Sequence, residues 1–342
     1  MATERLISPT QAPEEESVNW ALRPRNLDEY VGQAELVERL LIAVEAVQAR
    51  TKARSDDTKE HLEHVLLHGP PGLGKTTIAH VIGAELGTKV HTTSGPALAR
   101  GTDLVAVLTR LQPGDVLFID EIHRLPVAVE EFIYPAMEDF RIDVCLDTGM
   151  NARTVQINCA PFTLIGATTR AGLLSSPLRS RFGITHHLKY YDEPELKRIL
   201  SRSCTLLNVH EIRGGSLERI ASRSRGTPRI ANRLLRRVRD FADVRADGQL
   251  SESIVDDALR LEGVDALGLD DLDRAYVRTI ATIYEGGPVG LEAVAATMNE
   301  DAGTLEDVVE PYLLQIGFLA RTRRGRALTA KACEHLGVPI PA

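Results

Sequence analysis

The sequence has few cysteines and aromatic residues, and it has no long apolar run. Aromatic residues make up 4% of the chain, and the cysteines lack C-x-x-C spacing. A disulfide framework and a cysteine-rich zinc site are therefore excluded, and buried neutral thiols are the simplest interpretation. No segment is apolar for long enough to span a membrane, and the polar residues 1–17 hold no signal-peptide core. We expect a cytoplasmic protein with no membrane partner. The four cysteines are Cys145, Cys159, Cys204 and Cys333.

The length and charge of the chain limit the number of domains and the kinds of ligand to expect. At 342 residues the chain is too long for one ordinary core, so two or three domains are expected. Its 43% apolar and 26% charged residues are typical of globular proteins. The formal net charge of −8 excludes indiscriminate binding to nucleic acid, but it leaves room for a local basic patch.

Residues 69–77 read G-P-P-G-L-G-K-T-T and match the phosphate-loop pattern G-x-x-x-x-G-K-[ST]. The apolar run 64–68 before them suits a buried strand, and apolar residues at four-residue spacing after them predict a helix that ends at Gly87. In such a loop, backbone N–H groups surround phosphate oxygens, Lys75 reaches the β- and γ-phosphates, and Thr76 helps to hold Mg²⁺. A plain glycine-rich turn is the weaker alternative. The segment predicts binding of a nucleoside triphosphate.

Two later apolar runs end in polar residues. Residues 116–120 lead to Asp120 and Glu121, and a second run ends in Thr168 and Thr169. Alternation of such strands with helices predicts an α/β fold, with a parallel sheet covered by helices on both faces. At the carboxyl edge of that sheet, Asp120 would hold magnesium through water and Glu121 would activate a water for hydrolysis. Thr168 or Thr169 would sense the γ-phosphate, with a solvated strand end as an equal alternative.

Three arginines are candidates for contact with a phosphate. Arg179 and Arg181 lie two residues apart in a polar loop, and Arg229 opens a helix after a G-T-P turn. In NTPases a guanidinium from a neighbouring molecule stabilises charge on the transferred phosphate. An arginine at the start of a lid helix can couple nucleotide state to the angle between domains. Spacing alone favours a plain surface loop for Arg179 and Arg181, and the alternative for Arg229 is that it is one of seven exposed arginines.

The remaining chain indicates further domains. Residues 141–158 hold two alternating runs, which predict a hairpin that leaves the α/β pattern. Helical patterns follow a hinge at 190–194, and three helices then precede a two-stranded ribbon at 318–329 with a turn at Gly325. Three helices and a basic ribbon predict a winged-helix variant of helix-turn-helix. We expect a leader (1–20), an ATPase domain (21–190), a helical lid (191–262) and a winged-helix head (263–342).

Four arginines surround the expected turn of the ribbon: Arg321, Arg323, Arg324 and Arg326. Guanidiniums on such a tip suit phosphate contacts across a groove of duplex DNA. No aromatic residue lies among them, so stacking on single-stranded bases is disfavoured. A solvated charged hairpin is the alternative.

Taken together, these motifs resemble the AAA+ ATPases and, more narrowly, the RuvB family of Holliday-junction branch-migration motors. The resemblance extends from about Leu22 to Gly337. It implies a six-subunit ring around duplex DNA, a RuvA tetramer that holds the four-way junction, and a RuvC-type resolvase in a larger complex. The hairpin 141–158 would dock on RuvA through Val144, Leu146 and Met150. The segments that carry the resemblance are 69–77, 115–125, 134–139, 162–172 and 225–240.

The resemblance also implies roles for single residues, with ATP and Mg²⁺ as the ligands. Lys75 and Thr76 would bind phosphate and magnesium, Asp120 and Glu121 would be the metal and water carboxylates, and Thr168 or Thr169 the first sensor. Arg181 would be the arginine finger that acts on the next subunit's ATP, and Arg229 the second sensor. The nucleotide-contacting set would further include Leu22, Arg23, Gly72, Gly74, Thr77, Glu138, Asp139, Phe140, Arg179 and Tyr191. Arg321, Arg326 and Arg323 would contact DNA.

Two departures and two rival functions remain open. Ala302 stands where the family often has a DNA-contacting arginine, and Arg323 stands where a proline is common in the wing. A clamp-loader-like or remodelling factor that acts on protein is one rival, which the winged-helix end and the hairpin disfavour. A nucleotide-gated transcription regulator is the other. An affinity that depends on operator sequence rather than on junction shape would favour it.

Overall fold

Five parallel strands form the centre of the first part of the chain. The computed structural model describes residues 20–53, 59–145 and 154–337. They divide into two compact units, Arg23–Tyr190 and Tyr191–Ala342, the latter with Met1–Leu22. In the first unit the strand order is β2-β3-β6-β1-β7, with every pair parallel. The strands are β1 (Val65–His68), β2 (Val90–Ser94), β3 (Val116–Asp120), β6 (Thr163–Thr168) and β7 (Ile184–His187).

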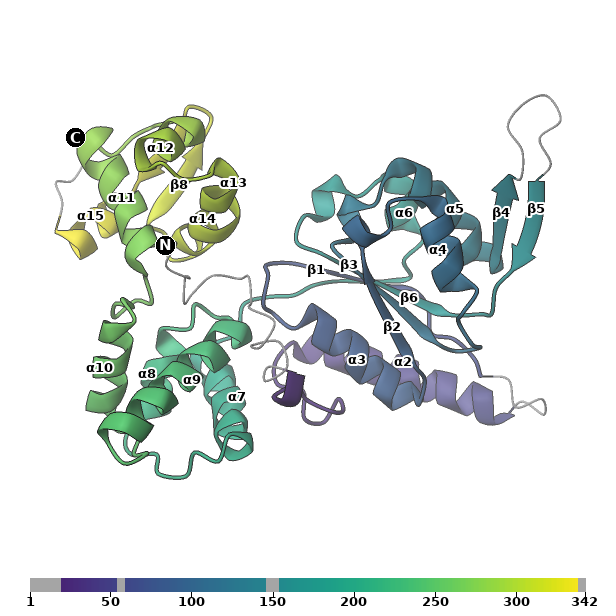
Figure 1. Cartoon of the computed structure of the whole chain (residues 1–342), viewed down its shortest axis with the longest axis horizontal. Helices are drawn as coiled ribbons and strands as arrows, with labels where there is room; N and C mark the ends of the chain where they lie inside the picture. The colour runs from purple at the N-terminus through teal and green to yellow at the C-terminus, as the bar shows by residue number, and fades with distance from the viewer. Residues whose placement is uncertain (1–19, 54–58, 146–153, 338–342) are drawn as a thin grey trace. The chain divides into compact units, whose positions relative to one another are not determined.

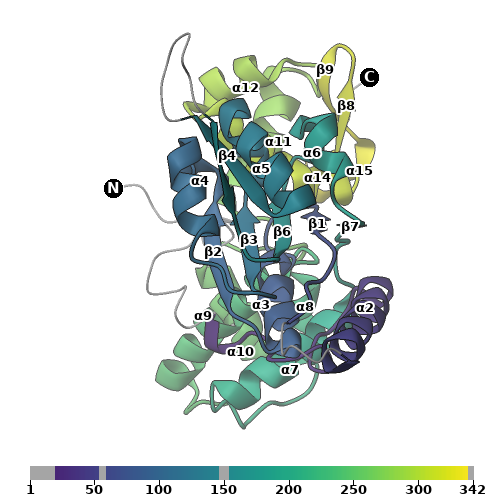
Figure 2. The same ribbon diagram turned by 90° about the vertical axis from the view of Figure 1, so that its right-hand side faces the viewer.

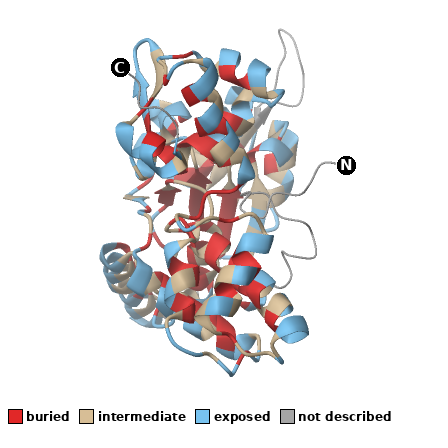
Figure 3. Cartoon of the chain, turned by 90° about the vertical axis from the view of Figure 1, so that its left-hand side faces the viewer, coloured by how far each residue is buried: buried red, intermediate tan, exposed pale blue. Residues whose placement is uncertain are grey.

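Helices cover both faces of this sheet, as Figures 1 and 2 show. One face carries two helices, α2 (Ala34–Ala53) and α3 (Lys75–Leu86). The other face carries α4 (Gly101–Leu108), α5 (Val127–Asp139) and α6 (Ser176–Ser180). Strands buried on both faces read as continuous apolar runs, which is why β3 and β6 could be recognised in the sequence. Figure 3 shows the buried residues concentrated along these strands and the inward faces of the helices. The predicted α/β class is confirmed.

The predicted hairpin is also observed. Strands β4 (Arg141–Cys145) and β5 (Thr154–Asn158) pair antiparallel, with Arg141 opposite Asn158, and they form a separate sheet. Figure 1 shows the two strands extending beyond α5. Val155 exposes 41% of its surface. The side chain of Val144, and Leu146 and Met150, lie outside the described residues.

Strand β7 was missed. The sequence analysis expected a polar loop around Arg179 and Arg181 and then a hinge at 190–194, but Ile184–His187 form an edge strand that pairs with β1. Its sequence, I-T-H-H, is short and mostly polar, and only one face of an edge strand needs apolar residues.

The second unit begins with a four-helix lid. Its helices are α7 (Glu193–Leu206), α8 (Ser216–Ser222), α9 (Pro228–Arg245) and α10 (Glu252–Leu261). Helix α7 starts in a capping box, in which Asp192 and Glu195 each accept from the other's backbone N–H. Helix α9 starts at Pro228, whose ring suits the first turn, and it buries Ile230, Leu234 and Val238 along one face.

The head that follows has the predicted order of three helices and a ribbon. Its elements are α11 (Asp271–Ile283), α12 (Leu291–Met298), α13 (Ala302–Thr304), α14 (Glu310–Gln315), β8 (Leu319–Thr322), β9 (Gly325–Leu328) and α15 (Ala330–Leu336). The third of the helices expected before the ribbon is interrupted by a π-turn at Leu305–Val309. Pro311 has no N–H to continue the α-helical ladder, which accounts for the irregular turn before it.

The turn of the ribbon lies at Arg323 and Arg324 rather than at Gly325. Gly325 is the first residue of β9 and has φ +133°. A Cβ there would lie 2.3 Å from the carbonyl oxygen of Val289. Val289 is close because it forms an antiparallel β-bridge with Arg326 of the ribbon. Glycine is needed at this position for a close backbone approach.

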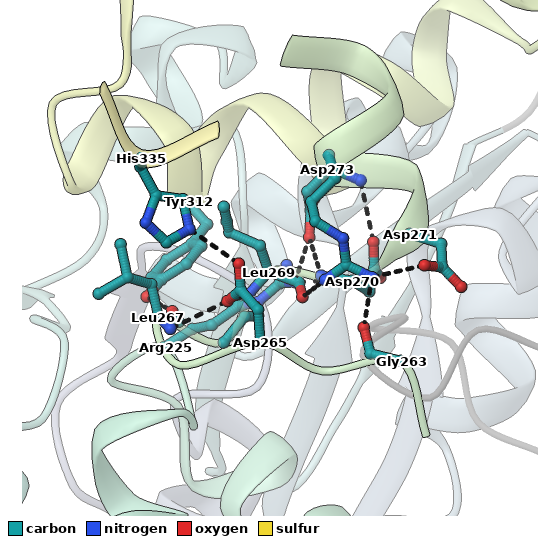
Figure 4. A network of polar contacts seen from close by, with 12 residues as sticks. Arg225, Gly263, Asp265, Leu267, Leu269, Asp270, Asp271, Asp273, Tyr312 and His335 are labelled. Atoms are coloured by element: carbon teal, nitrogen blue, oxygen red, sulfur yellow. Dashed lines mark hydrogen bonds and ion pairs between the residues drawn. The ribbon is translucent and has the colours of Figure 1, made fainter. Parts of the chain in front are cut away.

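Arg225, in the connection between α8 and α9, joins the lid to the head (Figure 4). Its Nε donates to the carbonyl of Gly268 at 2.8 Å, and its Nη2 is paired with the carboxylate of Asp273. The ring of Tyr312 lies 4.8 Å from the guanidinium carbon. Arg225 and Asp273 expose 4% and 0% of their surface. Removing one partner of such a buried pair leaves an uncompensated charge.

We expect Asp273→Asn to lower the free energy of unfolding of this unit by about 3 kcal/mol, because the buried Arg225 loses its nearer counter-charge and keeps only Asp270, 3.9 Å from Nη2. Asparagine can still accept the hydrogen bond from the Asp270 N–H that caps α11. Urea unfolding followed by circular dichroism measures the effect. The control is Asp271→Asn, an 89% exposed side chain paired with Arg274, which should cost less than about 1 kcal/mol. Equal losses of unfolding free energy in the two variants would show that the buried pair of Arg225 and Asp273 is no more important than the exposed pair of Asp271 and Arg274.

Candidate active site

The phosphate loop lies between β1 and α3, as the sequence predicts. Gly74 precedes α3 with φ +97°, a left-handed conformation that favours glycine. The ammonium of Lys75 donates to the carbonyls of Gly69 and Pro70, each at 2.8 Å. Lys75 is 7% exposed, so its ammonium is buried against the backbone of the phosphate loop. A loop of this shape presents its N–H groups and one cation to an anion, which is the arrangement that binds phosphates.

The strand order brings the second motif to the same edge of the sheet. Strand β6 lies between β3 and β1, and Thr168 is in register with His68, just before the phosphate loop. The Gly69 N–H donates to the Thr168 carbonyl at 3.2 Å. Asp120 ends β3, and its Oδ1 accepts from the Glu121 N–H at 2.9 Å. The carboxyl ends of neighbouring parallel strands therefore carry the acidic pair and the phosphate loop together.

Glu121 is held in an unusual conformation. Its φ of +46° is left-handed, which is uncommon for a residue other than glycine and frequent at functional sites. Its Oε2 accepts from the Thr169 hydroxyl at 3.3 Å and lies 3.2 Å from His123 Nδ1. Thr168 is fully buried, and its hydroxyl lies 2.8 Å from the same ring nitrogen. The two threonines therefore differ, since only Thr169 contacts Glu121 directly. The sequence analysis missed His123.

The residues at this edge fit a magnesium ion bound together with a nucleotide. Mg²⁺ keeps several waters and takes one or two protein ligands plus phosphate oxygens. Thr76, in the first turn of α3, and Asp120 supply hard oxygen ligands of this kind. Within the described residues no three His, Cys, Asp or Glu side chains gather as a metal cluster, so a metal held by protein alone is not indicated there.

His68 lies directly before the loop and stacks on His187 with 4.9 Å between ring centroids. Burial, and then the neighbouring His187, lower the pKa of His68. The imidazole is thus neutral at physiological pH, and Lys75 is the cation at this end of β1.

Arg181 lies on the surface formed by α5 and α6. Its Nη1 donates to the Pro177 carbonyl at 2.6 Å, its Nη2 lies 3.0 Å from Glu138, and its guanidinium carbon lies 4.5 Å from the Tyr134 ring centroid. In the described part of the chain, its hydrogen bonds and ion pairs all go to these two helices. Arg179 donates to the Ala171 carbonyl at 2.6 Å.

Three further predicted residues lie at the end of α5, beside Arg181. Glu138 pairs with Arg181, and Asp139 lies 3.2 Å from Arg141. Phe140 has φ +51° and contacts the rings of His61 and Phe162. Among these three residues Glu138 contacts Arg181, while Asp139 and Phe140 follow it in the sequence and contact other side chains.

Other predicted nucleotide contacts belong to the second unit. The Leu22 carbonyl accepts from Arg202, and the Tyr191 N–H donates to the Gly226 carbonyl at 2.9 Å. Arg229 is in the first turn of α9. Arg23 belongs to the first unit, where its charge contributes, after burial, to a lowered pKa of His80.

The wing arginines are not equivalent. Glu310 is fully buried and accepts from Arg321 Nε at 2.7 Å, Arg326 Nε at 2.8 Å and the Tyr276 hydroxyl at 2.6 Å. Burial, and then this bond to Glu310, raise the pKa of Tyr276, while the bond to Glu310 raises that of Arg326. Arg323 and Arg324 are exposed at the turn. No ion pair reaches either of their side chains from the residues that the structure describes.

Comparisons with known families identify the whole arrangement. The model of the Holliday junction DNA helicase RuvB P-loop domain matches residues 22–188. The RuvB AAA lid domain matches residues 191–265, and the RuvB C-terminal winged helix domain matches residues 266–337. The chain belongs to the RuvB family.

Relatives in the RuvB family are similar over nearly their full length. The Holliday junction branch migration complex subunit RuvB of Kosmotoga olearia is 52% identical over 335 residues, covering 98% of this chain and 95% of that protein. The RuvB subunit of a Parafrankia species is 54% identical over 338 residues, covering 99% and 93%.

A solved structure agrees with these sequence relatives. The Holliday junction branch migration motor RuvB of Thermotoga maritima has a TM-score of 0.83 and 52% identity, and the match covers 94% of this chain and all of that one (100%). The predicted resemblance to the AAA+ ATPases and to RuvB is confirmed, as is the fold of P-loop, lid and winged-helix domains.

We expect Glu310→Gln to destabilise the RuvB winged-helix head by about 3–5 kcal/mol, because two guanidiniums lose their buried counter-charge. Glu306→Gln is the matched control. Glu306 lies 3.4 Å from Arg326 and 3.8 Å from Arg321, but its side chain is 39% exposed, so the loss should stay below about 1 kcal/mol. The urea concentrations at the unfolding midpoints of the two variants measure the difference. Equal midpoints would show that the bonds from Arg321 and Arg326 to Glu310 do not stabilise the ribbon.

Proposed function

We propose that this chain is the ATP-hydrolysing motor that drives branch migration of Holliday junctions in recombination and DNA repair. The main support is the match of three RuvB domain models, in order, from residue 22 to residue 337. The phosphate loop and the acidic pair stand together at one edge of the sheet, as hydrolysis requires. The relatives are named as branch-migration subunits and as a motor.

In the proposed reaction a water attacks the γ-phosphorus of ATP, the bond from that phosphorus to the β,γ-bridging oxygen breaks, and ADP leaves with the bridging oxygen. Glu121 accepts a proton from that water, and Lys75 neutralises charge on the β- and γ-phosphate oxygens. Magnesium, held by Thr76 and through water by Asp120, would supply further charge neutralisation on the same oxygens. The loop residues Gly72, Gly74 and Thr77 would contribute backbone contacts to the phosphates. Thr169 would be the first sensor, because its hydroxyl contacts Glu121, whereas Thr168 is buried.

The second half of each active site would come from the next subunit of a six-membered ring. Arg181, which is held by contacts with α5 and α6, would meet a nucleotide on a neighbour. There it would stabilise charge on the transferred phosphate. Arg179, Glu138, Asp139 and Phe140 lie in the same region and would contact the same nucleotide.

The lid would respond to the nucleotide. Leu22, Arg23 and Tyr191 would contact the nucleoside, and Arg229 would reach the γ-phosphate from the start of α9. Hydrolysis would then change the angle between the ATPase domain and the lid. Because Arg225 ties the lid to the head, the head would follow that change.

The partners would be DNA, a RuvA tetramer and a RuvC-type resolvase in the cytoplasm. The hairpin 141–158 would dock on RuvA, and Val155 gives it an exposed apolar side chain. Arg321, Arg326 and Arg323 would contact the phosphates of duplex DNA. No described helix is both long and apolar enough to cross a bilayer.

The test is the dissociation of a synthetic four-way junction by the chain with a RuvA tetramer and ATP. We expect junction arms to separate with wild-type chain and to remain joined with Lys75→Ala, because the variant cannot hold the β- and γ-phosphates. Linear duplex of the same sequence is the substrate control. ATP hydrolysis that leaves the junction intact, or an affinity set by DNA sequence rather than by junction shape, would contradict the proposal.

A further inference from the structure

His123 lies beside the carboxylate of Glu121, the proposed base for hydrolysis. Glu121 ends the strand region in a left-handed conformation, and the short 3₁₀ turn Ile122–Arg124 follows. Ile122 is fully buried and anchors this turn, while the Arg124 N–H donates to the Glu121 carbonyl at 2.9 Å. Because this turn reverses the direction of the chain, the side chain of His123 lies beside that of Glu121.

The ring of His123 bridges the ends of two strands. Its Nδ1 lies 3.2 Å from Glu121 Oε2, after β3, and 2.8 Å from the Thr168 hydroxyl, at the end of β6. The side chain of His123 is 8% exposed. Thr168 is itself fixed, because its hydroxyl also accepts from the Arg170 N–H at 2.9 Å.

The neighbouring carboxylate favours the tautomer of His123 in which Nδ1 carries the hydrogen. A carboxylate oxygen can only accept, so a nitrogen 3.2 Å away is a favourable neighbour when it is protonated. In the Nδ1–H tautomer the hydrogen bond goes to the Thr168 hydroxyl at 2.8 Å, and the same N–H lies beside Glu121 Oε2. Glu121 Oε2 thus accepts a hydrogen bond from the Thr169 hydroxyl and lies 3.2 Å from His123 Nδ1, and Oε1 is the oxygen left to receive a proton from water.

We propose that His123 is a positioning residue for hydrolysis, which holds Oε2 of Glu121 so that Oε1 is directed at the attacking water. This inference rests on the proposed role of Glu121 as the base. A general base must lie within hydrogen-bond reach of the proton it takes, and a displacement of about 1 Å can cost about a hundredfold in rate. His123 does not touch the nucleotide in this assignment. Its loss therefore changes kcat and leaves nucleotide affinity unchanged.

The experiment compares three substitutions at position 123 in the full-length chain. His123→Ala removes the donor, and we expect DNA-independent ATPase kcat to fall about 10- to 100-fold with KM within about twofold of wild type. His123→Asn places an amide N–H where Nδ1–H stands and should recover most of that loss. His123→Gln is the matched control, because its amide lies one bond further along the side chain and should not recover it.

Nucleotide binding provides the second readout. A fluorescent ATP analogue should bind the three variants and wild type with the same affinity, because a residue that only positions Glu121 makes no contact with the nucleotide. If His123→Ala hydrolyses ATP like wild type, or if asparagine and glutamine rescue equally, the positioning role is wrong. If kcat falls only in step with a loss of nucleotide affinity or of the folded state, the residue is structural and the inference is also overturned.

Glu121→Gln separates this inference from the proposed function. It should bind the analogue normally and hydrolyse ATP at less than about a hundredth of the wild-type rate. Normal hydrolysis by Glu121→Gln would reject Glu121 as the base. An inactive Glu121→Gln beside a fully active His123→Ala would reject only the role of His123.

Discussion

The parallel pairing of β3, β6 and β1 is the constraint on which the catalytic geometry depends. Because all three strands run the same way, their carboxyl ends meet at one edge and deliver the acidic pair, the threonines and the phosphate loop together. The Gly69 N–H is bonded to the Thr168 carbonyl, so the loop starts from a fixed point on β6. Glu121 turns away from the strand in a left-handed conformation, and the contacts of Thr169 and His123 with its carboxylate stabilise that arrangement.

Buried ion pairs have the corresponding role in the second unit. Arg225 and Asp273 hold the lid against the head, and Glu310 holds the ribbon against the helices of the head. Buried pairs are weak sources of stability compared with apolar packing, but the loss of one partner is costly. These buried ion pairs therefore determine how the lid meets the head and how the ribbon packs on the helices. Arg321 and Arg326 are consequently oriented by Glu310, while Arg323 and Arg324 extend from the turn.

Local patterns were sufficient for much of this account. Residues 69–77 define the loop by themselves, and the buried runs before Asp120 and Thr168 predict the parallel sheet and the edge where its polar residues meet. Contacts between distant residues were not predictable in this way. Glu310 meets the Tyr276 hydroxyl across 34 positions, and His123 meets Thr168 across 45, so neither has a local signature. Strand β7 was missed because an edge strand can be short and polar.

The central claim is that each active site combines a phosphate loop from one subunit with Arg181 from the next. Its most direct test is the ATPase activity of a mixture of Lys75→Ala and Arg181→Ala chains, each inactive alone. In a randomly mixed ring, about a quarter of the interfaces join an intact phosphate loop to an intact arginine, so about a quarter of wild-type activity is expected. A mixture that stays as inactive as its two components would contradict an arginine supplied by the neighbour.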